Sequence, residues 1–204
     1  FVFAKNMKID TKNNKELYFR WKESLVDGII IPNMSSENSR LVLKYITDME
    51  KGFNVALGCK KGSRSYSRLN TIKSRFIFFD NQFKTHLSLN DITKITEEQL
   101  CTFFHDMRSG KIKKQNNQDY KSVADYVKAF KSFWHWYMKI SKKEGITIND
   151  ITVDLDTSKL KPKWVYLTEE EIKKLFDNAK YEYKVLMWFL FDTGLRPKEM
   201  INIR

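Results

Sequence analysis

The spacing of apolar residues is helical along most of the chain, because apolar positions recur every three or four residues. Only seven glycines and three prolines interrupt this pattern, which is typical of helices joined by few tight turns. The helix predicted over 120–142 is the longest. The helix over 185–191 is almost wholly apolar, so we expect it to be buried on all sides. The fold class predicted is mainly α, and the expected helices cover residues 15–26, 36–52, 63–79, 97–107, 120–142, 169–179 and 185–191.

Two of the helix starts carry a capping box, in which a threonine and a residue three positions later satisfy each other's backbone N–H groups. The pairs are Thr96 with Gln99 and Thr168 with Glu171. Gly194 fits the end of the apolar helix, since glycine readily adopts the left-handed conformation that ends many helices.

The polar stretch over 147–163 divides the helical pattern in two. We expect a helical domain over 35–150, a linker of at most marginal structure over 151–162, and the start of a second domain over 163–204. The segment over 1–34 has no assigned role. It fits a DNA-binding arm, a packing element or the remnant of a preceding domain.

Positive charge dominates the composition: the formal net charge is +12 over 204 residues. Hydrophobic residues make up 42% of the chain, which is ordinary for a globular protein and too high for a disordered one. The charge indicates a polyanionic partner, with DNA or RNA first and an anionic membrane surface second. No apolar run approaches the roughly 20 residues that span a bilayer, so binding to a membrane would need a surface-lying helix.

Metal sites and disulfides are not indicated by the sequence. Cys59 and Cys101 lack the spacing of metal ligands, and the three histidines are scattered. We therefore expect no metal, and a reducing, intracellular location. The chain opens with Phe1 rather than methionine, so we expect it to be an excerpt of a longer protein.

The densest basic region lies between Glu50 and Asp80, where no acidic residue occurs. At 100° per residue, Arg64, Arg68 and Arg75 fall on one stripe beside an apolar stripe. Such a helix suits docking along a phosphate backbone or into a major groove, although a solvated face with incidental charge is the alternative. The cations of this region are Lys51, Lys60, Lys61, Arg64, Arg68, Lys73 and Arg75.

The helix over 120–142 repeats this design, with rings on one face and cations on the other. The aromatic run over 133–137 is better explained as core than as a platform for stacking single-stranded bases. His135 lies on the basic face, where it is either a phosphate contact or an exposed bystander. The lysines of this face, which we expect to contact DNA, are Lys121, Lys128, Lys131, Lys139 and Lys142.

An arginine box closes the chain. Residues 192–203 read Asp-Thr-Gly-Leu-Arg-Pro-Lys-Glu-Met-Ile-Asn-Ile, so that Arg196 follows a Gly-Leu turn and Glu199 lies three positions later. An arginine at a helix start offers a guanidinium beside free backbone N–H groups, which suits phosphate binding. This run resembles the first active-site arginine box of the tyrosine recombinases and integrases, T-G-L/A-R-x-x-E-hydrophobic. Residues 163–176 are similar to the L-T-x-E-E-I/L-x-x-L entrance of the catalytic domain in that family.

The resemblance implies a basic, SAM-like core-binding bundle over 35–150, linked to the first helices of a catalytic domain over 163–204. It implies site-specific recombination or integration of double-stranded DNA, through a covalent 3′-phosphotyrosyl intermediate and without metal or cofactor. Arg196 matches the first catalytic arginine, and Glu199 matches a supporting acid. Because the nucleophilic tyrosine lies downstream in the family, this chain alone is expected to bind DNA and not to cut it.

In the family, the complete protein assembles as a tetramer on two DNA sites. The resemblance also implies a cytoplasmic, nucleoid-associated protein. A second hypothesis is a non-catalytic, integrase-like module that occupies recombination sites and competes with the enzyme. A third is a helical RNA-binding or scaffold protein that uses the same cations, and it predicts no preference for a duplex site.

Overall fold

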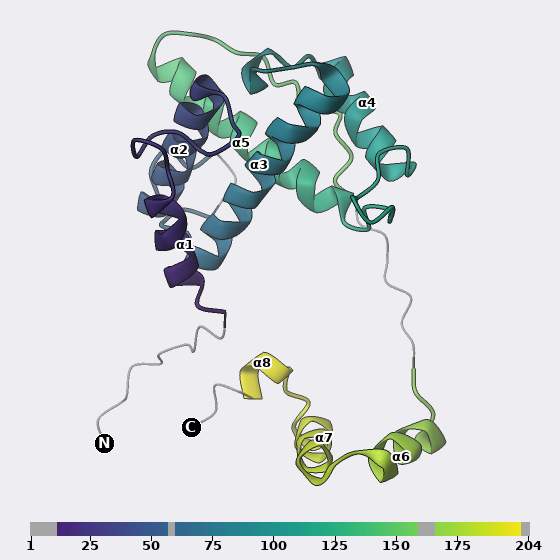
Figure 1. Cartoon of the computed structure of the whole chain (residues 1–204). Coiled ribbons are helices and arrows are strands. Elements are labelled where there is room, and N and C mark those ends of the chain that lie inside the picture. The colour runs from purple at the N-terminus through teal and green to yellow at the C-terminus, as the bar shows by residue number, and fades with distance from the viewer. Residues whose placement is uncertain (1–11, 57–59, 159–165, 201–204) are drawn as a thin grey trace, which may run out of the picture. The chain divides into compact units, whose positions relative to one another are not determined.

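The computed structural model describes residues 12–56, 60–158 and 166–200 (Figure 1). These residues are mainly helical and contain no strand apart from the single β-bridge between Val26 and Ile30, so the predicted α class is confirmed. The chain divides into two compact units. The first unit is Lys12–Lys159, and the second contains Leu160–Arg204.

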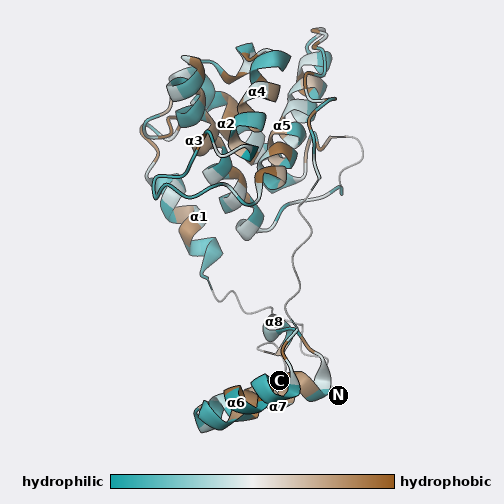
Figure 2. Ribbon diagram, turned by 90° about the vertical axis from the view of Figure 1, so that its right-hand side faces the viewer, coloured by the Kyte–Doolittle hydropathy of each residue, from teal (hydrophilic) through white to brown (hydrophobic). Residues whose placement is uncertain are grey.

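The first unit is a helical bundle around an aromatic core. Helices α1 and α2 pack against α3, while α3 and α4 both pack against α5. Figure 2 shows hydrophobic positions in brown interspersed with hydrophilic ones along these helices, and the buried hydrophobic residues form the core. At its centre the rings of Phe76 and Phe133 are 4.7 Å apart, and both are fully buried. The elements are α1 (Asn14–Glu23), α2 (Ser36–Lys51), α3 (Tyr66–Leu87), the 3₁₀ helix η1 (Ile92–Lys94), α4 (Glu97–Arg108) and α5 (Val123–Lys143).

Several predicted helix limits change in the structure. Helix α3 continues to Leu87 rather than ending at Phe79, because the buried Phe83 extends its apolar stripe. Its 22 residues exceed the 21 of α5, so the prediction that the helix over 120–142 is the longest is wrong. Helix α1 stops before Val26, whose backbone bonds to Ile30 instead. The capping box of Thr96 with Gln99 is present as predicted.

The described part of the N-terminal segment is a packing element of the first unit. Tyr18 of α1 is fully buried and donates a hydrogen bond from its hydroxyl to Glu50 Oε2 at 2.9 Å. Burial and this carboxylate raise the pKa of Tyr18, so the hydroxyl stays protonated. Lys22 reaches the same carboxylate at 2.7 Å, which ties α1 to the end of α2. Of the three roles left open for 1–34, packing fits residues 12–34.

The predicted linker is folded onto the bundle through residue 158. Thr152 is fully buried and Leu155 nearly so. Trp134 Nε1 donates to the carbonyl of Asn149 at 3.0 Å, and Lys131 Nζ donates to the carbonyl of Thr152 at 2.9 Å. The expectation of marginal structure was wrong for 151–158. This segment is polar in sequence, but its buried side chains and its hydrogen bonds with α5 hold it on the bundle. The rest of the predicted linker, 159–162, lies outside the described residues.

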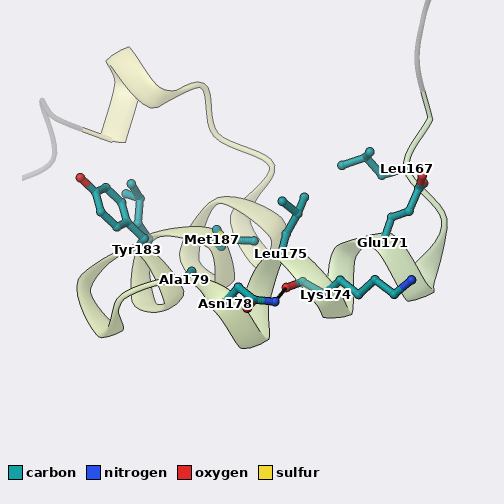
Figure 3. Close-up of a pocket in the computed structure, with 9 residues that line it drawn as sticks. Leu167, Glu171, Lys174, Leu175, Asn178, Ala179, Tyr183 and Met187 are labelled. Carbon is teal, nitrogen blue, oxygen red and sulfur yellow. Dashed lines mark hydrogen bonds between the residues drawn. The ribbon is translucent and has the colours of Figure 1, made fainter.

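The second unit contains α6 (Glu169–Asn178), α7 (Tyr181–Thr193) and the short α8 (Pro197–Met200). Thr168 and Glu171 form the predicted capping box, and Gly194 ends α7 in the left-handed conformation at φ 62°. Helix α7 is not buried as expected: Trp188 is 61% exposed, because α6 is the main apolar partner that the described residues provide. An apolar groove of about 800 Å³ lies between the two helices (Figure 3). None of the described helices is long and apolar enough to cross a membrane.

Candidate nucleic-acid interface

A cleft with a positively charged rim lies at the start of α3. Ser65 begins this helix by accepting a hydrogen bond from the backbone N–H of Arg68. The cleft has a volume of about 240 Å³, and we call it the basic cleft. Lys60, Arg64 and Arg68 line its rim, with Ser132 of α5. Its floor consists of Tyr45, Met49, Val55, Ala56 and Ile72, all of which are less than a tenth exposed.

The walls of the basic cleft are held by backbone contacts between segments distant in sequence. The backbone N–H of Arg64 donates to the carbonyl of Met49 at 2.9 Å, which fixes the approach to α3 against the end of α2. Lys139 Nζ donates to the carbonyl of Val55 at 2.8 Å, so α5 holds the opposite wall. The predicted DNA-binding residue Lys139 is therefore a structural support of the cleft, because its ammonium is engaged by the protein.

The rim cations have no acidic partner among the described residues. Lys60 and Arg68 are exposed and make no side-chain hydrogen bond or ion pair there. Arg64 is half-buried and its guanidinium makes only a 3.3 Å contact with the carbonyl of Gly62. Three like charges converge here without compensation, and such an arrangement favours an anion.

Two other predicted cations of α3 are occupied by aromatic rings. The guanidinium of Arg75 lies 3.3 Å from the ring centroid of Tyr126, and Lys73 Nζ lies 5.2 Å from the ring of Trp21. Burial lowers the pKa of Lys73. Cation–π contacts of this kind bind the helices of the bundle to one another. The stripe of arginines predicted from the helical wheel is thus divided: Arg64 and Arg68 face the cleft, whereas Arg75 packs on α5.

The predicted basic face of α5 is divided in the same way. Lys131 holds the carbonyl of Thr152, and His135 Nε2 lies 2.8 Å from Asp150 Oδ2, so His135 is neither an exposed bystander nor a residue left for phosphate. Burial alone raises the pKa of Asp150, but hydrogen bonds from Thr152 and contact with His135 outweigh it and lower the pKa below its ordinary range. These contacts fasten residues 150–152 to α5.

Four predicted cations are exposed and have no hydrogen bond or ion pair from their side chains among the described residues: Lys61, Lys121, Lys128 and Lys142. None of them lines the basic cleft. The rings over 133–137 belong to the core as predicted, since Phe133, Trp134 and Trp136 are at most 2% exposed.

Arg196 and Glu199 lie in the second unit, at the start of α8. Glu199 Oε2 accepts a hydrogen bond from the backbone N–H of Arg196 at 3.0 Å, and the N–H groups of Glu199 and Met200 bond to the carbonyl of Arg196. Pro197 has no N–H. The expectation of free backbone donors around Arg196 is therefore wrong for Arg196, Glu199 and Met200, whereas the guanidinium of Arg196 is exposed and can bind a phosphate.

Ser132 of the cleft and a second role of Gly52 were not predicted from the sequence. Ser132 lines the basic cleft, but its hydroxyl donates to the carbonyl of Lys128 at 2.8 Å and nothing in the local sequence marks it. Gly52 was assigned only as a helix end, although it also permits the close approach of 62–63. Among the described residues, no group of histidine, cysteine and acidic side chains could hold a metal ion.

No family model, curated protein or solved structure matches the chain.

Proposed function

We propose that the first unit binds duplex DNA through the basic cleft and the exposed lysines of the same unit. The observation that carries this proposal is the convergence of Lys60, Arg64 and Arg68 on one cleft with no carboxylate partner among the described residues. Arginine forks and ammonium groups bind phosphate oxygens through charge-assisted hydrogen bonds. The net charge of +12 adds a long-range attraction that brings a polyanion to this surface.

We further propose that the chain belongs to a DNA breaking and rejoining enzyme of the tyrosine recombinase type. The support is the arginine box in sequence, together with the exposed guanidinium of Arg196. In this proposal Arg196 stabilises charge on the scissile phosphate, as a positioned cation does in a transition state. Glu199 keeps the start of α8 in place by binding the backbone of Arg196. The complete protein supplies the tyrosine nucleophile and acts as a tetramer on two DNA sites.

The test is a suicide-substrate assay with the complete protein and nicked DNA from its native junctions. Expected is a DNA adduct that survives phenol extraction and is destroyed by protease, since the phosphotyrosyl bond links protein to DNA. Arg196→Ala abolishes the adduct while leaving site binding mostly intact. Full cleavage by Arg196→Ala contradicts the assignment of Arg196.

A non-catalytic DNA-binding module gives a different result in the same assay. It binds the site tightly and in a salt-dependent manner, yet no adduct forms with any nicked substrate. An RNA-binding or scaffold protein shows neither adduct nor preference for the duplex. Binding and adduct formation therefore separate the three possibilities.

A further inference from the structure

We infer that the basic cleft seats one backbone phosphate of the duplex, which Lys60, Arg64 and Arg68 share. This inference rests on the proposed DNA binding and makes it more specific. Three cations placed one after another along the entry into α3 could instead contact three successive phosphates. The geometry of the cleft favours a single shared phosphate.

The three cations lie at different points of the chain and line one cleft. Lys60 precedes the turn at Gly62, whereas Arg68 lies in the first turn of α3 with Arg64 between them, and all three line the same 240 Å³ cleft. The space suits one phosphate group with the edge of its sugar. The floor residues Tyr45 and Ile72 are at most 4% exposed, so an anion rests on them and cannot go deeper.

The neighbouring cations do not extend the cleft into a track along α3. Beyond Arg68, the next two cations of the helix, Lys73 and Arg75, lie against the rings of Trp21 and Tyr126. The cationic rim therefore ends after Arg68. A duplex backbone that follows α3 finds one point of concentrated charge there, which suits one phosphate held by several donors.

The cleft is also preformed, which reduces the entropy lost when an anion is bound. The hydrogen bond from Arg64 N to Met49 O and the bond from Lys139 Nζ to Val55 O hold its two walls. The carbonyl of Val55 already accepts a hydrogen bond from Lys139, so it does not compete with a phosphate for the rim cations.

The first experiment measures how the affinity for a fluorescent duplex depends on salt, using the full chain. Each neutralised phosphate contributes about 0.9 to the slope of log affinity against log salt. For a shared phosphate, the triple variant Lys60→Gln/Arg64→Gln/Arg68→Gln lowers the slope by about 0.9 in total. Each single variant weakens binding about ten-fold, and the losses are not additive, because the three side chains act on one group.

Three separate contacts predict a different outcome: the triple variant lowers the slope by about 2.7, and the single losses add. That result overturns the shared seat. Unchanged duplex binding by the triple variant overturns it as well, while leaving DNA binding elsewhere on the protein intact. Thermal unfolding of each variant is the folding control, since Lys60 and Arg68 make no internal side-chain bond among the described residues.

The second experiment distinguishes failure of the seat from failure of the proposed function. Sodium phosphate is titrated into the ¹⁵N-labelled chain at constant ionic strength, with sodium chloride as the comparison. Saturable shifts of the amide signals over 60–68, lost in Arg68→Gln and kept in Lys113→Gln, support the seat; Lys113 is an exposed lysine outside the cleft. If these amide shifts occur although the chain binds no duplex, the cleft is a site for a free phosphate ester, and the proposed DNA binding is wrong. Duplex binding without any such shift, and with an unaltered slope in the triple variant, overturns the seat alone.

Discussion

Gly52 lies directly against the backbone of Gly62: a β-carbon on Gly52 would stand 2.6 Å from the Gly62 carbonyl carbon and 2.7 Å from the backbone nitrogen of Ser63. Gly52 also ends α2 in the left-handed conformation, with φ 75°. One glycine thus ends a helix and lets the chain that enters α3 pass beside that end. The basic cleft depends on this close approach, because Arg64 follows immediately.

Gly52→Ala should therefore lower the free energy of unfolding of the first unit by more than the backbone strain alone accounts for. The left-handed conformation costs alanine roughly 1–2 kcal/mol, and the clash with the backbone of Gly62 and Ser63 adds to it. Gly145→Ala is the matched control, since Gly145 has φ 81° and no atom within 4 Å of an added β-carbon. Urea denaturation measures both free energies of unfolding. Equal losses in the two variants would contradict the close approach.

Two arginines of α3 should respond in opposite ways to the same substitution. Arg75→Gln removes the stack on Tyr126, which lowers the free energy of unfolding by about 1 kcal/mol and leaves the salt slope of DNA binding unchanged. Arg68→Gln leaves stability unchanged and weakens binding, because Arg68 makes no internal side-chain bond among the described residues. Denaturation and duplex binding at several salt concentrations give both quantities for each variant. A salt slope that falls with Arg75→Gln would place that residue on the DNA.

Local chemistry made the two capped helix starts predictable, but not that of α7, which begins at Tyr181 rather than at 185. Contacts between distant residues decided where α3 ends. Both capping boxes form as expected, since each involves only residues three positions apart. The helix predicted over 63–79 stops directly before Asp80, a charged residue within the apolar pattern of α3. Asp80 is in fact buried, with Asn38 Nδ2 at 2.7 Å and Lys84 Nζ at 2.6 Å. Asn38 lies in α2, so no window around Asp80 reveals that partner.

The candidate site, like the helices, was predictable where its signal is local and not where it depends on distant residues. Charge counting identified the basic region between Glu50 and Asp80, because an excess of cations is visible in composition. It could not separate Arg68 from Arg75, since the ring that occupies Arg75 comes from another helix. The same holds for His135, whose partner Asp150 lies in a stretch that looked like a linker.

The docking of residues 150–152 on α5 should depend on pH through Asp150. Its pKa is lowered in the folded chain, so ionised Asp150 stabilises the fold above the ordinary carboxyl pKa of about 3.9, and this contribution is lost as the pH falls through the lower, folded value. Asp150→Asn should reduce the free energy of unfolding by about 1 kcal/mol at pH 7 and by progressively less in acid.

Asp154→Asn is the control for this prediction. It removes a carboxylate from the same segment, but Asp154 is exposed and makes no hydrogen bond or ion pair among the described residues. Urea denaturation of the two variants between pH 3 and pH 7 checks the expectation. A difference between Asp150→Asn and the parent chain that is the same at every pH would show that the carboxylate charge is not involved.

Glu199 offers a way to separate a capping role from a chemical one. Its carboxylate binds the backbone N–H of Arg196, and a glutamine oxygen at the same position accepts the same hydrogen bond. If capping is its role, Glu199→Gln in the complete protein retains adduct formation on nicked DNA. Glu199→Ala lowers it about five-fold, which corresponds to a capping bond of about 1 kcal/mol. Loss of the adduct in both variants, with duplex binding preserved, would instead mean that the negative charge of Glu199 takes part in the chemistry.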